Sequence, residues 1–483
     1  MLVAAAKRRG GGVVVRVACA AELVARRDDG DDGGDDGDEY DAACARGART
    51  GLLRERTADV ADAYYAKIGA QLCYHAEQNA KHSPTFPVVF TAMHGVGKHW
   101  VARAFDTFKL APYVAVAEQI EPDPDFPTVD FPNPEEGKGA LALAFATADR
   151  HNASLVLAND PDSDRLAVAE RRARGWTVFS GNDIGILLAH WAYTQYKQRH
   201  GAAAVPNDKL LVMNTTVSSK MLKAFADAEG LRYEETLTGF KWIGSVAIAK
   251  CRREGLTFLF GFEEAIGFML GDACFDKDGV RAAAVFAEMA LHLSLHEQRS
   301  VAEQLQYLKE KYGHFISNNR YFFCYEPSKM ADVFARLRTG GDDGGYIRSA
   351  GRFRVEHIRD LTTGYDSRAA NGKATLPVSK SSQMITYYFT NGAVVTLRGS
   401  GTEPKLKYYA ELGGADPVAT RAEVNELVAA IIKDMLQPDV HGLVPPPSAG
   451  GDDEDEGDDT AAVAAAVDGA GGGDGGGAAS AGA

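Results

Sequence analysis

The sequence lacks long apolar runs, has few cysteines and contains no serine before Ser83. No stretch of roughly 18 apolar residues is present, so no membrane span is predicted. The six cysteines, at positions 19, 44, 73, 251, 274 and 324, are scattered and form no Cys-x-x-Cys pair. This pattern excludes a disulfide scaffold and fits a reducing compartment, so we expect a cytoplasmic protein.

Two acidic stretches dominate the net charge of −14. Residues 28–41 contain nine Asp or Glu residues and the chain from Asp439 onward contains ten, with no Lys or Arg in either stretch. Without these nineteen acids the remaining residues would carry a net charge of +5, which suits a small phosphorylated substrate. The basic residues are not clustered as in nucleic-acid-binding proteins, so neither nucleic acid nor a membrane is expected as a partner.

Three aspartates at alternate positions follow a short apolar run in LVLANDPDSDR, residues 155–165. The run predicts a buried strand, and the turn after it carries Asp160, Asp162 and Asp164. Alternate side chains of an extended segment point the same way, so the three carboxylates can converge. Converging anions repel each other unless a cation lies between them, and a hard cation such as Mg²⁺ prefers oxygen ligands. The stretch therefore predicts a magnesium site.

Two other interpretations of this turn stay open. It resembles a plain solvated acidic loop, and it also fits the Asp-x-Asp motif of an enzyme that forms an aspartyl phosphate. A calcium-binding EF-hand is excluded, because that loop requires Gly at its sixth position and Glu at its twelfth. Here these positions hold Arg165 and Arg171.

A second loop rich in donors, RGSGTEPK at residues 398–405, follows the apolar run 394–397. It combines two cations, two hydroxyls and two glycines. Small residues expose backbone N–H groups, hydroxyls add donors, and Arg binds two phosphate oxygens at once. The loop therefore predicts a phosphate-binding site. The glycine-rich loop HGVG at residues 94–97, between a predicted strand and helix, is interpreted as a tight turn.

Ten stretches stand out along the chain: TAMHGVGKHW, FPNPEEGKGAL, LANDPDSDRLAVAE, TTVSSK, EETLTGFKWIG, FEEAIGF, DKDGV, IRDLTTGYD, SKSSQMIT and RGSGTEPKLKYYAEL. In this order they resemble motifs of the alpha-D-phosphohexomutase superfamily and of its phosphoglucomutase-2/phosphopentomutase branch. The resemblance implies a Mg²⁺-dependent intramolecular phosphotransferase that interconverts sugar 1-phosphates with glucose 6-phosphate or (deoxy)ribose 5-phosphate. It also implies a sugar bisphosphate of the glucose 1,6-bisphosphate type as activator.

The resemblance assigns roles to individual residues. Asp160, Asp162 and Asp164 match the magnesium loop. Arg165 matches the catalytic-site arginine that adjoins this loop, Lys277 a lysine near the reacting phosphate, and Glu263 a ligand of a sugar hydroxyl. Thr238 and Gly239, with Lys241 close by, match a loop that contacts the substrate. The loop that holds the non-reacting phosphate is matched by Arg398, Ser400, Gly401, Thr402 and Lys405. Ala265 stands where hexose enzymes of the family often carry serine, so the resemblance leaves hexose and pentose substrates open.

One element of the family is missing from the sequence. The family transfers phosphate through a phosphoserine in its first domain, but no serine precedes Ser83, and residues 50–54 are only a faint match to that region. In one interpretation, unrelated low-complexity residues replace the first domain and the chain is inactive. In the other, the chain is a non-catalytic sugar-phosphate-binding regulatory relative. The low-complexity composition of residues 1–57 favours the first.

The strand pattern and the resemblance together predict an α/β protein with disordered acidic termini. The expected divisions are a disordered low-complexity segment at 1–57, a mixed-sheet α/β domain with the metal loop at 58–180, an α/β domain with the sugar-binding loop at 181–314, a C-terminal α+β phosphate-binding domain at 315–438 and a disordered acidic tail at 439–483. The two α/β domains correspond to the second and third domains of the family.

Overall fold

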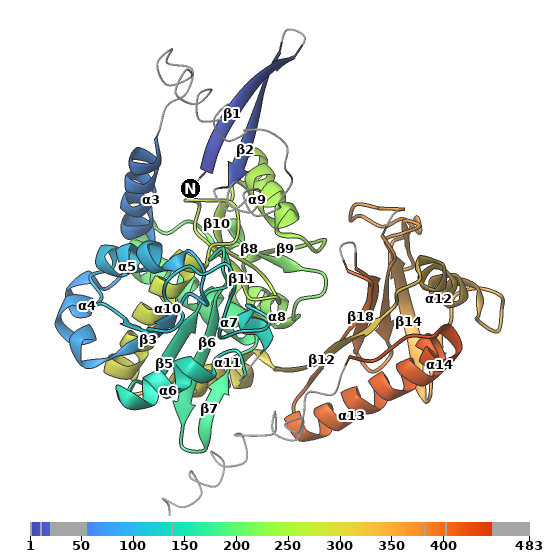
Figure 1. Ribbon diagram of the computed structural model, residues 1–483. Helices are drawn as coiled ribbons and strands as arrows, with labels where there is room; N and C mark the ends of the chain where they lie inside the picture. The colour runs from blue at the N-terminus through green and yellow to red at the C-terminus, as the bar shows by residue number, and fades with distance from the viewer. Residues whose placement is uncertain are drawn as a thin grey trace, which may run out of the picture.

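The computed structural model describes residues 2–9, 12–19, 56–136, 139–380, 382–400 and 403–446. Within them, a hairpin of β1 (Leu2–Arg9) and β2 (Gly12–Cys19) precedes three larger sheets with flanking helices (Figure 1). The predicted α/β class is confirmed. No helix in these residues is both long and apolar enough to cross a bilayer.

The first sheet carries the predicted metal loop. Its strand order is β4-β3-β5-β6-β7, in which β4, β3 and β5 pair in parallel and β6 and β7 pair antiparallel. The strands and helices of this part are α3 (Thr57–Leu72), α4 (Ala76–His82), β3 (Val88–Thr91), α5 (Gly97–Thr107), β4 (Val114–Ala115), α6 (Ala142–Arg150), β5 (Leu155–Ala158), β6 (Ala167–Arg172) and β7 (Gly175–Val178). Every residue of β3 and β5 is buried, as is typical of short apolar strands in a covered sheet.

The second sheet carries the predicted sugar-binding loop, and its strand order is β11-β10-β8-β9. The strands and helices of this part are α7 (Gly181–His200), β8 (Leu210–Thr215), α8 (Met221–Glu229), β9 (Arg232–Thr236), α9 (Phe240–Glu254), β10 (Thr257–Glu263), β11 (Gly267–Leu270), α10 (Gly279–His292) and α11 (Val301–Tyr312). Helix α7 begins with a capping box, in which the Ser180 side chain accepts the Asp183 N–H and the Asp183 carboxylate accepts the Ser180 N–H.

The third sheet runs β12-β18-β17-β16-β14-β13, with β15 paired to β14. The strands and helices of this part are β12 (His314–Phe323), α12 (Pro327–Thr339), β13 (Ser349–Ala350), β14 (Phe353–Asp360), β15 (Tyr365–Asp366), β16 (Met384–Phe389), β17 (Val394–Gly399), β18 (Lys405–Gly414), α13 (Pro417–Ala430) and α14 (Pro438–His441). Residues of β18 alternate between half-buried and buried positions, so Lys405, Lys407, Tyr409 and Glu411 share one face of the sheet.

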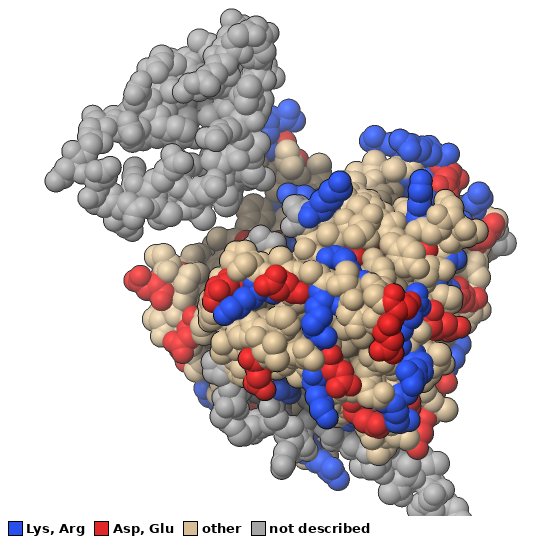
Figure 2. Space-filling model, turned by 90° about the vertical axis from the view of Figure 1, so that its right-hand side faces the viewer, with Lys and Arg blue, Asp and Glu red and all other residues tan. Residues whose placement is uncertain are grey.

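Hydrophobic packing divides the described residues into two units. The first two sheets share one core that extends from Tyr65 to Tyr312, whereas the third sheet packs around a separate core that extends from Phe322 to Leu443. We call these the N-terminal unit (residues 56–313) and the C-terminal unit (residues 314–446). On the side of the molecule shown in Figure 2, basic and acidic residues are interspersed rather than gathered in one patch.

The acidic tail begins later than the sequence predicts. Pro438–His441 forms α14 rather than a disordered segment, and Val444 pairs with Phe323 at the end of β12. The physical reason is that Leu443 is buried in the core of the C-terminal unit. The predicted disorder of residues 28–41 and 447–483 lies outside the described residues, and sequence patterning did not foresee the hairpin of β1 and β2.

Gly95 lies against the metal loop at a point where no side chain fits. A Cβ here would lie 2.3 Å from both the Cα and the carbonyl oxygen of Pro161, and Val96 donates its N–H to the same oxygen at 2.9 Å. We expect Gly95→Ala to lower the free energy of unfolding by about 1–3 kcal/mol, the usual cost of overpacking, in urea denaturation. The matched control is Gly139→Ala, because a Cβ there meets nothing within 4 Å. Equal effects of the two substitutions would contradict this interpretation.

Candidate functional site

The three predicted metal ligands come together at the carboxyl end of β5. One oxygen from each of Asp160, Asp162 and Asp164 lies within 4.8 Å of the other two. Asp160 is buried, Asp162 is exposed and Asp164 is half-buried, so the cluster has a closed side and an open side. Such a set of hard oxygen donors fits Mg²⁺.

Negative charge at this cluster is only partly offset by protein cations. Burial, together with the charges of Asp162 and Asp164, raises the pKa of the Asp160 carboxyl to about 7. The Arg165 Nε atom lies 3.5 Å from Asp160 Oδ2 and 3.9 Å from Asp164 Oδ1, and the Lys277 ammonium forms an ion pair with Asp164. The two predicted cations, Arg165 and Lys277, are therefore at the cluster, and the raised pKa shows that the site still favours added positive charge.

Backbone contacts from two other segments hold the aspartate turn in place. The Arg165 N–H donates to Asp160 Oδ1 at 3.0 Å, and the Gly279 N–H donates to the Ser163 carbonyl at 3.1 Å. A Cβ at Gly279 would lie 2.1 Å from the Arg165 carbonyl oxygen, so the start of α10 reaches the turn only because this residue is glycine. The turn is thus fixed by α10 on one side and by the loop before α5 on the other.

The predicted sugar-binding residues lie beside this cluster. Glu263 ends β10, and its Oε1 accepts the N–H of Gly239, which precedes α9, at 2.6 Å. The charges of Lys277 and Arg165 act on Glu263, so the two loops share one electrostatic environment. Thr238 is half-buried next to Gly239, whereas Lys241 is exposed at the start of α9.

The predicted phosphate loop lies in the C-terminal unit. Arg398 near the end of β17 is paired with Lys407 of β18, so the two cations are neighbours on one sheet face. The Ser400 N–H donates to the Lys405 carbonyl at 2.9 Å, which closes the loop. The Lys405 ammonium lies 2.6 Å from a Glu403 carboxylate oxygen and 4.5 Å from the centre of the Tyr321 ring. Gly401 and Thr402, also predicted to bind phosphate, lie outside the described residues.

Two residues connect the phosphate loop electrostatically to the other two loops. Burial and then the charge of Glu264 raise the pKa of Glu135, while Arg165 and Lys407 act in the opposite direction. Burial and then Glu264 also raise the pKa of Tyr409, which Arg398 lowers by charge and by a hydrogen bond. Charged residues of the metal loop, the sugar loop and the C-terminal sheet are therefore close enough to shift the pKa values of Glu135 and Tyr409 together.

Sequence reasoning missed four residues of this site: Glu135, Glu264, Lys407 and Tyr409. The alternation of side chains along a strand would have found two of them, because Lys407 and Tyr409 follow Lys405 at intervals of two. Glu264 adjoins the predicted Glu263. Glu135 lies in an irregular proline-rich stretch, and no local pattern indicates where its side chain lies.

Comparison with known proteins identifies the family. A model described as phosphoglucomutase/phosphomannomutase, alpha/beta/alpha domain II, matches residues 62–175, and the corresponding model of domain III matches residues 180–312. The chain belongs to the phosphoglucomutase/phosphomannomutase family. This confirms the predicted membership of the alpha-D-phosphohexomutase superfamily, and the matches of the two models fall within the N-terminal unit.

Curated relatives support the predicted branch. The chain is 46% identical to human phosphopentomutase over 399 residues, which cover 82% of this chain and 64% of that protein. It is also 46% identical to human glucose 1,6-bisphosphate synthase over 399 residues, which cover 81% of this chain and 63% of that protein. The chain thus spans just under two thirds of the length of these relatives. Among solved structures, the open form of parafusin, a phosphoglucomutase from Paramecium, shares the fold with a TM-score of 0.53 at 17% identity, covering 78% of this chain and 61% of that one.

Glu263 is expected to make the stability of this family member depend on pH. Burial and the adjacent charge of Glu264 raise its pKa to about 7, above the ordinary value of 4.5. A carboxyl whose pKa is raised by folding stabilises the folded state below its unfolded pKa, and this contribution is lost as the pH rises through the folded pKa. We therefore expect the free energy of unfolding of Glu263→Gln at pH 8 to exceed that of the unaltered chain by about 1–2 kcal/mol. This difference should shrink towards pH 5.

Chemical denaturation at pH 5, 6.5 and 8 measures this dependence. Glu118→Gln is the control, because Glu118 is exposed, and its effect should not vary with pH. If the difference in the free energy of unfolding between Glu263→Gln and the unaltered chain is constant across this range, the pKa of the Glu263 carboxyl is not raised by folding.

Proposed function

We propose that these loops form the Mg²⁺ and sugar-phosphate site of an intramolecular phosphotransferase. Such a phosphotransferase interconverts a sugar 1-phosphate with glucose 6-phosphate or (deoxy)ribose 5-phosphate, and we infer that this chain retains the binding site but lacks the turnover. The observation that carries the proposal is the convergence of Asp160, Asp162 and Asp164 within 4.8 Å, beside Arg165 and Lys277. The names of the relatives, phosphopentomutase and glucose 1,6-bisphosphate synthase, support a sugar-phosphate substrate class, and the second name includes the type of sugar bisphosphate that we propose as activator.

Each loop has a distinct role in this proposal. The three aspartates would hold Mg²⁺, which when bound supplies positive charge that stabilises a phosphoryl group during transfer. Arg165 and Lys277 lie at the same cluster and add donors for phosphate oxygens. Glu263 would accept a hydrogen bond from a sugar hydroxyl. Arg398, Ser400 and Lys405, with Lys407 beside Arg398, would bind the phosphate at the other end of the sugar.

The chain as sequenced offers no suitable serine nucleophile near its start. Ser83 is the first serine, and it is buried. Its hydroxyl donates to the Asn79 carbonyl at 2.6 Å and accepts the Ala111 N–H at 2.7 Å, so it is committed to structural contacts. This observation favours a second candidate function, in which the chain binds sugar phosphates without converting them.

The cysteines of the described residues are free thiols, which supports the proposed cytoplasmic location.

Metal binding tests the first step of the proposal. We expect Asp162→Asn to weaken the binding of MgCl₂ at least tenfold in calorimetry, because it removes one charged ligand of three from the open side of the cluster. Asp106→Asn, at an exposed position on α5, changes the net charge equally and should leave the affinity unchanged. Equal Mg²⁺ affinities for the unaltered chain and Asp162→Asn would exclude the aspartate cluster as the metal site.

Ligand binding tests the phosphate loop. We expect Arg398→Ala to weaken the binding of glucose 1,6-bisphosphate about 10- to 100-fold, because hydrogen bonds to charged groups contribute about 1.5–3 kcal/mol. The matched control is Arg352→Ala, since Arg352 is exposed and pairs with Glu426 of α13 at 2.6 Å. Unchanged affinity after Arg398→Ala would contradict the proposed site.

A coupled assay distinguishes the two candidate functions. We expect no conversion of ribose 1-phosphate or glucose 1-phosphate by this chain, even where calorimetry detects binding, because its first serine, Ser83, is buried and hydrogen-bonded to Asn79 and Ala111. Robust conversion would exclude the non-catalytic function and would show that another group serves as the phosphate acceptor.

A further inference from the structure

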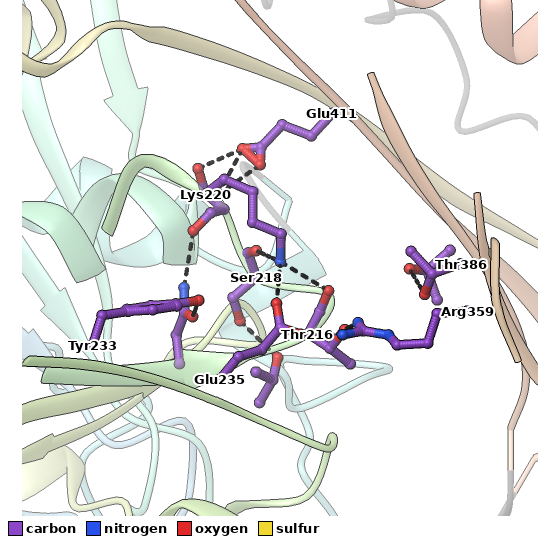
Figure 3. A network of polar contacts seen from close by, with 12 residues as sticks. Thr216, Ser218, Lys220, Tyr233, Glu235, Arg359, Thr386 and Glu411 are labelled. Atoms are coloured by element: carbon purple, nitrogen blue, oxygen red, sulfur yellow. Dashed lines mark hydrogen bonds and ion pairs between the residues drawn. The ribbon is translucent and has the colours of Figure 1, made fainter. Parts of the chain in front are cut away.

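The loop of residues 215–220, TTVSSK, lies between the two units and contacts both. It follows β8 of the second sheet, and Figure 3 shows its polar side chains directed towards acidic and basic groups around it. Because the two units have separate cores, contacts at this loop are among those that set how the units sit relative to each other. A small apolar cluster of Val217, Leu361 and Met384 accompanies the polar contacts.

On one side, the loop binds the C-terminal sheet through Glu411. The Glu411 carboxylate accepts the Ser219 hydroxyl at 2.6 Å and the Lys220 N–H at 2.8 Å. Glu411 belongs to the same face of β18 as Lys407 and Tyr409, and it lies four residues beyond Lys407 along the strand. A shift of Glu411 relative to the loop would therefore also shift the cations that are proposed to bind phosphate.

A second polar contact joins the same loop to β14 of the C-terminal sheet. The Arg359 guanidinium, which is only 5% exposed, lies 2.7 Å from a Glu235 oxygen and donates to the Thr216 hydroxyl. The Lys220 ammonium lies 2.9 Å from the other Glu235 oxygen. Burial alone would raise the pKa of Glu235, but the charges of Lys220 and Arg359 outweigh it and lower the pKa to about 2. The contact is thus a fully charged network across the two units.

On its other side, the loop binds the carboxylate next to the proposed sugar ligand. Glu264 Oε2 accepts the Thr215 hydroxyl at 3.2 Å and the Ser218 hydroxyl at 2.9 Å. Glu264 directly follows Glu263 at the end of β10. The six residues of this loop therefore form hydrogen bonds both to the sugar-binding loop and to the C-terminal sheet.

We propose that the loop 215–220 is a positioning element that acts through Glu411 and Arg359. It fixes Arg398 and Lys407 at the distance from Glu263 at which one sugar bisphosphate contacts both units. This inference rests on the proposed function. It adds that Glu411 and Arg359 determine the affinity for a ligand with two phosphates, although neither residue touches the substrate. A ligand that occupies the C-terminal unit alone does not need this alignment.

The test compares two ligands on the full chain. We expect Glu411→Gln and Arg359→Lys each to weaken the binding of glucose 1,6-bisphosphate about tenfold in calorimetry. Inorganic phosphate is measured in the absence of Mg²⁺, and only the part of its binding that Arg398→Ala abolishes is counted. The affinity of this part should change less than twofold in the two variants. A purely structural role would weaken both ligands alike, so the ratio of the two affinities is the diagnostic quantity.

Controls separate positioning from loss of charge or of folding. Glu426→Gln makes the same chemical change as Glu411→Gln at an exposed site on α13 and should leave both affinities unchanged. If Glu411→Gln or Arg359→Lys does not fold, Ser219→Ala removes only the hydroxyl that donates to Glu411, and about a threefold loss confined to the bisphosphate is expected.

The outcomes distinguish this inference from the proposed function. If the unaltered chain does not bind the bisphosphate, or binds it independently of Arg398, then the proposed function fails and this inference fails with it. If the unaltered chain binds through Arg398 but the loop variants bind the bisphosphate equally well, or lose both ligands equally, only the positioning role is overturned.

Discussion

Repulsion among the carboxylates of Asp160, Asp162 and Asp164 is the constraint around which the site is built. Two like charges about 5 Å apart repel by about 3 kcal/mol at an effective dielectric constant near 20, and water at the exposed Asp162 reduces this value. Summed over three pairs, the repulsion is comparable to the free energy of unfolding of a typical domain. Arg165 and Lys277 offset part of it. Burial, followed by the charges of Asp162 and Asp164, still raises the pKa of Asp160. The structure therefore keeps the three anions together against their mutual repulsion, which is the state that a divalent cation stabilises.

Backbone contacts rather than side-chain packing keep this turn from spreading. Pro161 is bound by the loop before α5, and Ser163 is bound by the start of α10. Both approaches require glycine, at Gly95 and Gly279, because a Cβ at either position would collide with backbone atoms. These glycines come from segments nearly 200 residues apart, so the geometry of the aspartates depends on the packing of the whole N-terminal unit and not on the turn alone. This dependence explains how the carboxylates of a short acidic motif are held close together here.

The sequence predicted those parts of the site that depend on local pattern. The strand before Asp160 and the alternation of the three aspartates are local, and the structure brings the carboxylates together as predicted. The contacts of Glu411 with Lys220 and of Arg359 with Glu235 were not predicted, because the partners are more than 100 residues apart and each residue alone reads as a surface charge. The end of the C-terminal unit was also misplaced, since the acidic composition after Asp439 concealed the single buried side chain of Leu443. Composition thus located the acidic regions but could not reveal one apolar contact that orders part of such a region.

The polar contacts between the two units suit the ligand that is proposed for this site. Apolar contacts such as Val217 with Leu361 and Met384 stabilise association, but they tolerate sliding because they have no preferred direction. Buried ion pairs contribute little net stability after desolvation, but their hydrogen bonds are directional and are lost when either partner moves. A ligand that carries phosphate at both ends requires a defined spacing between two binding loops more than it requires a strongly held interface. In the proposed function, the contacts of Glu411 and Arg359 define this spacing. A change in the arrangement of the two units would leave a buried charge without its partner, and the cost of that unpaired charge opposes the change.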